Sequence, residues 1–223
     1  MAEIETYFKP SDLKNWAYET IKRKILDVEV SAGDQLRIEF LAEQLGTSRT
    51  PIREALLKLE SEGLVRAASR VGFFVQGITK KDLQELFELR EILESYAAEK
   101  AAVSIDVKDI EKLEGYQTRA RKAVTAGDRT EFMNMEIEIH SLILREAGNI
   151  RLIQMIDSIK DLIHRERVLS LQSSENIDES FNEHQQIVNA ISRKDAKLAG
   201  RAMRSHILAV KKRMLGFLQL PDE

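Results

Sequence analysis

Three of the four histidines and one glutamate have a spacing that suits a divalent metal. Glu136 and His140 are four residues apart, so on a helix both side chains project from the same face. His184 and His206 lie in later amphipathic segments, which a helical bundle would gather around one interior. Carboxylate and imidazole donors suit divalent transition metals, here zinc, nickel or manganese. Because a histidine on a helix is more often a surface or core residue than a ligand, the spacing also leaves open a bundle without metal.

A second group of residues has the chemistry to read DNA. Arg49 and Arg53 are four residues apart and would lie together on one helix face, opposite an apolar stripe that includes Ile52. The planar guanidinium of arginine pairs with guanine O6 and N7 or holds phosphate, and the hydroxyls of Ser48 and Thr50 can donate to phosphate. Taken alone, such an arginine pair is usually an ordinary surface charge.

The N-terminal elements predict how these arginines are presented. We expect an amphipathic helix from Ser11 to about Val28, a turn over 31–34, and a short helix that Gly46 ends. The next helix carries the arginines, with Ser48 or Thr50 as its cap, and Gly63 ends it. Short strands over 64–66 and 73–75 follow. This order predicts a winged helix-turn-helix with a small β-hairpin wing in residues 1–77.

The tip of this hairpin adds two candidate DNA contacts. Arg70 lies between the two strands, where it could enter the minor groove or hold the DNA backbone. Gly72 would let the hairpin turn and approach the DNA closely.

From Thr79 onward the sequence carries only helical signals. Residues 76–78 are the expected linker, and residues 78–223 are predicted to form an all-α antiparallel helical bundle, so the chain is mainly α. The expected helices are Thr79 to Val103, Asp106 to Ala126, Asp128 to Ala147, Ile150 to Leu171, Ser174 to Ser192, and Asp195 to Leu220, the last closing before Pro221.

Composition narrows the class of protein. The 223 residues suffice for two modest domains, and the absence of cysteine excludes disulfides and thiolate metal sites, as expected in the cytoplasm. No signal peptide and no apolar run near the length of a membrane span is found, so we expect no membrane partner. Residues 1–77 hold 11 basic and 12 acidic residues, so DNA affinity must come from a local basic face.

The N-terminal motif resembles that of a known family. The run Thr47-Ser48-Arg49-Thr50-Pro51-Ile52-Arg53-Glu54-Ala55-Leu56, within residues 12–78, is similar to the GntR-family DNA-binding domain. The resemblance implies that Arg49, Thr50 and Arg53 contact operator DNA and that Arg70 and Gly72 lie at the wing. Glu39 stands where some members have a basic residue, and whether Arg37 substitutes for it is open.

Residues 79–218 resemble the FCD ligand-binding domain of the FadR-type GntR subfamily. The likeness rests on Leu89-Arg90-Glu91-x-x-Glu94, on Glu183-His184-x-x-Ile187, and on the segments around His140 and His206. It implies a metal bound by Glu136, His140, His184 and His206, although metal-binding members have an aspartate where Glu136 stands. His164 matches no ligand position and is expected to be structural.

The same resemblance implies a small organic acid as effector. Arg90, together with Arg165 or Arg167, could supply the positive charge that binds it. For each arginine a salt bridge to a nearby glutamate is an equal alternative.

These observations predict a DNA-binding transcription regulator, a repressor, whose operator affinity responds to the organic acid. A homodimer is expected because one recognition helix reads only a half-site. The alternative is an enzyme, a metal-dependent hydrolase or lyase with an accessory winged helix, since a metal with an open position can activate water. No dedicated second acid or base is recognisable near the ligands, which favours the regulator and not an enzyme.

Overall fold

The computed structural model describes residues 12–171 and 174–217. The chain divides into two compact units with the boundary between Ile78 and Thr79, one residue beyond the predicted division. Each unit is described by itself.

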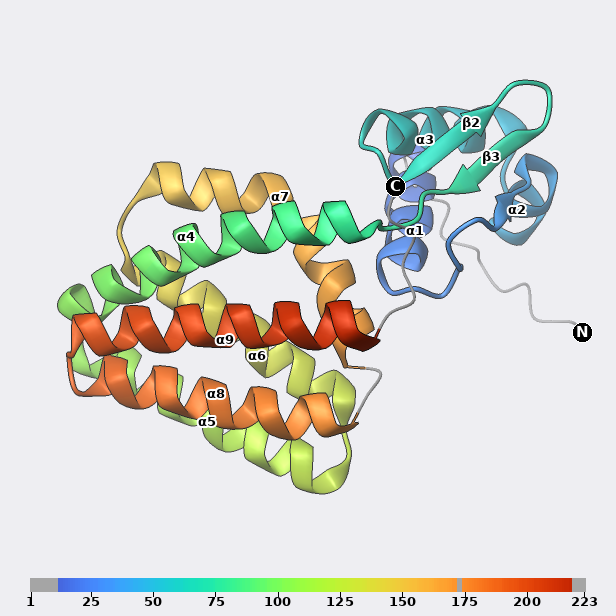
Figure 1. The fold of residues 1–223 in the computed structure, drawn as a ribbon. Coiled ribbons are helices and arrows are strands. Elements are labelled where there is room, and N and C mark those ends of the chain that lie inside the picture. Colours follow the sequence, from blue (N-terminus) through green and yellow to red (C-terminus); the bar gives the residue numbers. More distant parts are fainter. Residues whose placement is uncertain (1–11, 172–173, 218–223) are drawn as a thin grey trace, which may run out of the picture. The chain divides into compact units, whose positions relative to one another are not determined.

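In residues 12–78, the described part of the first unit, three helices combine with a three-stranded sheet (Figure 1). Its elements are α1 (Leu13–Leu26), β1 (Gln35–Leu36), α2 (Ile38–Gln44), α3 (Arg49–Ser61), β2 (Val65–Ala68) and β3 (Gly72–Val75). The strands are antiparallel in the order β1-β3-β2, with Leu36 opposite Phe73 and Val65 opposite Val75. The predicted hairpin is therefore confirmed, but the prediction missed β1, because two residues are too few to show an alternating pattern.

A side-chain hydrogen bond marks the start of α1, and the apolar face of α3 packs in the core. Asp12 caps α1, its side chain accepting from the Asn15 amide, and the predicted cap Ser11 lies outside the described residues. The apolar stripe of α3 packs with α1 and the sheet in one core, as the sequence predicted. The core of this unit includes Ala17, Ile21, Ile25, Leu36, Ile52, Ala55, Leu56, Leu59, Val65, Phe73 and Val75.

The second unit consists of helices throughout its described residues, which confirms the predicted bundle. The helices are α4 (Lys80–Ser104), α5 (Val107–Ala126), α6 (Arg129–Glu146), α7 (Ile150–Ser170), α8 (Ser174–Ser192) and α9 (Ala196–Phe217). Thr79 and Asp82 form a capping box at the start of α4, where the helix was predicted to begin, and Asp106 and Asp128 cap α5 and α6. The predicted end of the last helix, Leu220, lies outside the described residues.

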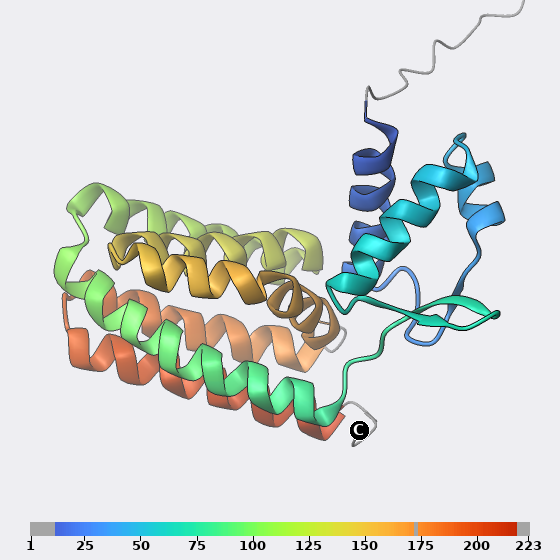
Figure 2. The same ribbon diagram turned by 90° about the horizontal axis from the view of Figure 1, so that it is seen from above.

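The bundle packs around α4 and α9, which lie side by side in both views (Figures 1 and 2). Gly200 of α9 lets the two helices approach closely, because a Cβ at this position would overlap the Glu99 side chain of α4. Helix α8 packs on α9 and α5, and α6 packs on α4 and α5. None of the described helices is long and apolar enough to cross a membrane.

Candidate functional site

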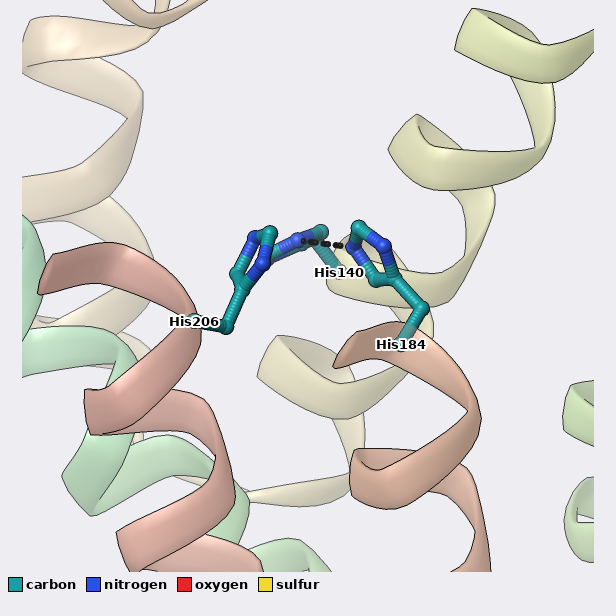
Figure 3. A group of neighbouring side chains, drawn as sticks. All are labelled: His140, His184 and His206. Atoms are coloured by element: carbon teal, nitrogen blue, oxygen red, sulfur yellow. Dashed lines mark hydrogen bonds between the residues drawn. The ribbon is translucent and has the colours of Figure 1, made fainter. Parts of the chain in front are cut away.

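Three histidines from three helices meet inside the bundle (Figure 3). His140 projects from α6, His184 from α8 and His206 from α9, and their exposed fractions are 8%, 2% and 3%. One ring nitrogen of each lies within 4.8 Å of the other two, and the Nε2 atoms of His140 and His184 are 2.9 Å apart. Distant segments of the sequence are thus joined in one buried cluster of imidazoles.

Each of these imidazoles has a hydrogen-bond acceptor beside its Nδ1 atom. His140 Nδ1 lies 2.5 Å from Glu94 Oε2, His206 Nδ1 lies 2.8 Å from Glu183 Oε2, and His184 Nδ1 lies 2.8 Å from the carbonyl oxygen of Ser180. A carboxylate or carbonyl oxygen only accepts, so Nδ1 of each ring donates the proton. A neutral ring then carries a lone pair on Nε2.

This arrangement suits a cation. Burial lowers the pKa of His140 to about 3, despite the opposing charge of Glu94, and burial lowers the pKa of His184 well below its usual range. Both rings are therefore neutral near pH 7, which is the form that binds metals. Two Nε2 lone pairs 2.9 Å apart repel each other unless a cation lies near them. Nitrogens that share a metal at about 2.1 Å stand roughly 3–4 Å apart, so the donor set fits a divalent metal.

Glu136 lies beside this cluster and not within it. Its buried carboxylate accepts a hydrogen bond from the Ser180 hydroxyl, and its Oε1 atom is 3.3 Å from His184 Nδ1. The group of mutually close donor atoms comprises the three histidines alone among the described residues. Glu138, two residues after Glu136, is exposed, and His164 lies on α7 outside the cluster.

A cavity of about 20 Å³ adjoins the histidines. This volume holds about one water molecule and is far below the hundreds of Å³ typical of ligand pockets. The residues that line it are mostly polar, and Leu171 and Val210 are the apolar ones. The lining residues are Arg90, Glu136, His140, Glu166, Arg167, Ser170, Leu171, Ser180, His206 and Val210.

The arginines expected to bind an effector differ in their placement. Arg90 is buried, and its guanidinium donates to Glu94 and Glu166, each at 2.6 Å, so its charge is already paired within the protein. Arg165 is buried on α7 but does not line the cavity. Arg167 does line it, and burial lowers the pKa of its guanidinium against the opposing charge of nearby carboxylates. Of the two arginines that the sequence left open, Arg167 faces the cavity.

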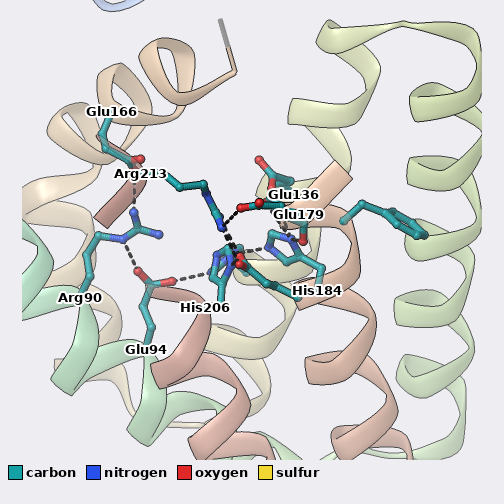
Figure 4. Close-up of polar contacts among 12 residues, drawn as sticks. Arg90, Glu94, Glu136, Glu166, Glu179, His184, His206 and Arg213 are labelled. Carbon is teal, nitrogen blue, oxygen red and sulfur yellow. Dashed lines mark hydrogen bonds and ion pairs between the residues drawn. The ribbon is translucent and has the colours of Figure 1, made fainter. Parts of the chain in front are cut away.

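Several polar residues of this site were missed in the sequence analysis (Figure 4). Glu94 follows Arg90 by one helical turn, and Glu183 directly precedes His184. Arg213 donates to Glu183 from two guanidinium nitrogens, at 2.6 and 2.9 Å. The sequence signals were this adjacency to a candidate residue and the presence of Glu94 and Glu183 in the motifs that resemble the FCD domain. Neither signal reveals that Glu183 contacts His206 of another helix.

The proposed DNA-reading residues lie on the exposed side of α3. Ser48, Arg49, Thr50 and Arg53 are exposed, whereas Ile52 is fully buried. Ser48 occupies the cap position, yet its side chain makes no hydrogen bond to the helix amides. The first-turn N–H groups of α3 and the Ser48 hydroxyl therefore both remain open to a phosphate.

The wing holds its shape through Gln35. The side-chain amide of Gln35 donates to the Val71 carbonyl oxygen at 2.8 Å. Gly72 has a φ of 127°, and a Cβ there would lie 3.2 Å from the Gln35 Nε2 atom, so both conformation and space favour glycine. Arg70 is exposed at the tip, with a φ of 63°.

Two charged residues at the start of α2, Arg37 and Glu39, lie near the wing and the start of α3 respectively. Glu39 pairs with Arg49 at 3.4 Å, and both side chains are largely exposed. Arg37 Nε donates to Gln35 Oε1 at 3.2 Å and is thereby tied to the wing. The exposed basic groups of this unit thus include Arg37 beside the wing as well as the two arginines of α3.

Comparison with known proteins matches the sequence to two described families. Residues 85–209 match the FCD domain, and residues 13–75 match the bacterial regulatory proteins of the gntR family. A gluconate operon transcriptional repressor of Bacillus subtilis is 29% identical over 189 residues, covering 82% of this chain and 76% of that protein. These families and relatives are transcription regulators and not enzymes.

Two solved structures have a similar fold. McbR/YncC of E. coli has a TM-score of 0.74 at 22% identity, covering 92% of this chain and 97% of that chain. The metal-free FCD domain of the transcriptional regulator TM0439 has a TM-score of 0.54 at 22% identity, covering 63% of this chain and 96% of that chain.

Proposed function

Since this chain belongs to the GntR-family transcription regulators with an FCD domain, we propose that it is a repressor whose operator affinity is set by a small organic acid bound beside a divalent metal. The observation that carries this proposal is the cluster of three buried histidines, two of which, His140 and His206, line one cavity together with Arg167. DNA is its partner through the winged helix-turn-helix, and we place its action in the cytoplasm, where operator DNA is found.

For the DNA contacts we propose Ser48, Arg49, Thr50 and Arg53 of α3 and Arg70 and Gly72 of the wing. The exposure of the five residues other than Gly72 and the open first turn of α3 support this assignment. Arginine at the start of a recognition helix reaches guanine edges in the major groove, while hydroxyl and amide groups hold phosphates.

For the metal we propose His140, His184 and His206 as ligands, with Glu136 as the fourth. The support is the convergence of the three imidazoles, two of them held neutral by burial, and the position of the Glu136 Oε1 atom 3.3 Å from His184 Nδ1. Zinc, nickel and manganese all accept imidazole and carboxylate donors. When bound, the metal would supply a Lewis-acidic position for a carboxylate.

For the effector we propose a carboxylate that contacts Arg167. Arg90 and Arg165 would contact it only after a movement that releases Arg90 from its two glutamates and brings Arg165 to the cavity. A guanidinium pairs with a carboxylate through two parallel hydrogen bonds. Because the cavity is only about 20 Å³, an acid enters only if the side chains around it move. The acid would then contact the rearranged side chains but not the closed cavity, and this difference in binding would favour the rearranged conformation.

We further propose that the protein acts as a homodimer. Helix α4 exposes Leu89, Ile92 and Tyr96 by 43%, 68% and 43%. Their spacing of three and four residues places them on one helix face, which a second copy of the chain would cover.

Gel retardation on a fragment of the protein's own promoter tests the whole scheme. Wild type should shift the fragment, and adding the effector acid should change its affinity only when metal is present. Arg49→Ala with Arg53→Ala is the control for the DNA contacts. Undiminished binding by this double variant would overturn their assignment, and metal analysis that finds nothing in purified protein would overturn the metal.

A further inference from the structure

The carboxylates of the buried Glu94 and the partly exposed Glu183 lie beside two of the histidines, and Figure 4 labels Glu94 and His206 among these residues. Glu94 of α4 accepts from His140 of α6, and Glu183 of α8 accepts from His206 of α9. We propose that Glu94 and Glu183 are positioning residues of the metal centre: each accepts the Nδ1 proton of its histidine and so leaves Nε2 free to bind the metal. The proposal rests on the function proposed above, because it concerns the same centre.

The orientation of each carboxylate is fixed by an arginine. Glu183 receives two hydrogen bonds from Arg213, at 2.6 and 2.9 Å, in the bidentate geometry that restrains both partners. Glu94 uses Oε1 to accept from Arg90 Nε at 2.6 Å and Oε2 to accept from His140. Arg90 is itself held by Glu166 of α7 at 2.6 Å. Neither carboxylate can turn away from its histidine without breaking its ion pair, and for the buried Glu94 an unpaired charge is costly.

The direction of these hydrogen bonds determines the tautomer of the histidine. Arginine has only donors and no acceptor, so each carboxylate between an arginine and an imidazole can serve only as acceptor on both sides. The imidazole must therefore place its proton on Nδ1. For His184 the backbone carbonyl of Ser180 has the same effect at 2.8 Å. Because this acceptor is a backbone atom, no side chain determines the tautomer of His184. The proposal therefore concerns the tautomers of His140 and His206 alone.

The glutamine variants separate this role from simple packing. In Glu94→Gln, Arg90 would donate to the amide oxygen, which is the only acceptor of the glutamine side chain. The NH₂ group would then face His140 Nδ1. A donor at that position favours the tautomer with its proton on Nε2, which blocks the metal. Glu183 differs, because its Oε2 atom accepts from both Arg213 Nη2 and His206 Nδ1 while Oε1 accepts from Arg213 Nη1. In Glu183→Gln a single amide oxygen replaces two acceptors for these three donors, so the hold on the Nδ1 proton of His206 weakens. Groups that orient metal-bound histidines typically cost 10–100-fold in affinity when they are removed.

Matched controls are available on the same helices. Glu179 contacts Arg213 Nη1 at 2.9 Å, one turn before Glu183, and Glu91 pairs with the exposed Arg204 on α9 at 2.7 Å. Neither is bonded to a histidine of the cluster. Glu179→Gln and Glu91→Gln therefore remove a charge and an ion pair but leave each imidazole with its acceptor.

The test uses the full chain and zinc alone as the probe, with competition against a chromogenic chelator. Glu94→Gln and Glu183→Gln should each bind zinc about 10–100-fold more weakly than wild type, and both control variants should bind like wild type. In the metal-free protein labelled with ¹⁵N-histidine, the ring shifts should show Nδ1–H for His140 and His206 in wild type, with Nε2–H gaining in the matching variant.

Unchanged zinc affinity in both variants, or Nε2–H rings in wild type, would overturn the proposal. Failure of wild type to bind zinc or any other metal would instead overturn the proposed function, while the ring shifts would still test the hydrogen bonds. Glu183 is partly exposed, so Glu183→Gln should keep the fold and decide the matter even where Glu94→Gln, with its buried site, does not fold.

Discussion

Lowering the pH should destabilise the helical unit much more than the unit that precedes it. In the folded, metal-free protein the pKa of His140 lies at about 3, because burial disfavours the charged ring, whereas the ordinary value is 6.5. The unfolded chain thus binds more protons between about pH 6.5 and pH 3. Stability that is present above pH 6.5 is therefore lost as the pH falls through this window.

The size of the effect follows from these two pKa values. Between pH 7.5 and pH 5, linkage gives a loss of about 2 kcal/mol in the free energy of unfolding from His140 alone. His184 contributes in the same direction, since burial also lowers its pKa. The first unit provides an internal control, because residues 1–78 contain no histidine.

Urea unfolding of the full chain with a metal chelator present measures both units at once. Far-UV circular dichroism follows the helices, and Trp16, the single tryptophan, reports on α1 of the first unit. The dichroism midpoint should fall between pH 7.5 and pH 5 while the Trp16 midpoint stays nearly constant. His140→Gln, which cannot titrate, should reduce the loss by about 2 kcal/mol. The reasoning is refuted if the helical unit is equally stable at both pH values, or if His140→Gln leaves the pH dependence unchanged.

Other expected outcomes concern single residues. Arg49→Lys should cost about 1–3 kcal/mol in operator binding, because lysine cannot pair with a guanine edge through two hydrogen bonds, and fluorescence anisotropy at fixed salt would check this. Arg167→Ala should abolish the response to an organic acid while zinc affinity and DNA binding persist, and a response equal to wild type in gel retardation would count against it. Ile92→Glu should shift the protein from dimer to monomer in analytical ultracentrifugation, since it places a charge in the proposed interface. Val28 adopts a φ of 57° that β-branched residues avoid, so Val28→Gly should stabilise the first unit by about 1 kcal/mol in urea unfolding followed by Trp16.

The order and type of the elements could be read from local patterns. Capping residues such as Thr79, Asp106 and Asp128 act within one helical turn, and the apolar stripe around Ile52 repeats with the helical period. These signals depend on near neighbours in the chain, so they predicted the helices and the wing. Strand β1 was missed because its hydrogen bonds lead to β3, nearly forty residues away.

The contacts of the candidate metal centre do not follow from local sequence patterns. The chain by itself determined that histidines would project from three helices, since periodicity sets the face on which each side chain lies. Only the tertiary structure decided that Glu94 and Glu183 stand behind His140 and His206, that Glu136 contacts Ser180, and that Arg167 rather than Arg165 lines the cavity. The physical reason is that each of these contacts joins different helices. Their rotation and offset are set by side-chain packing, which local periodicity does not specify.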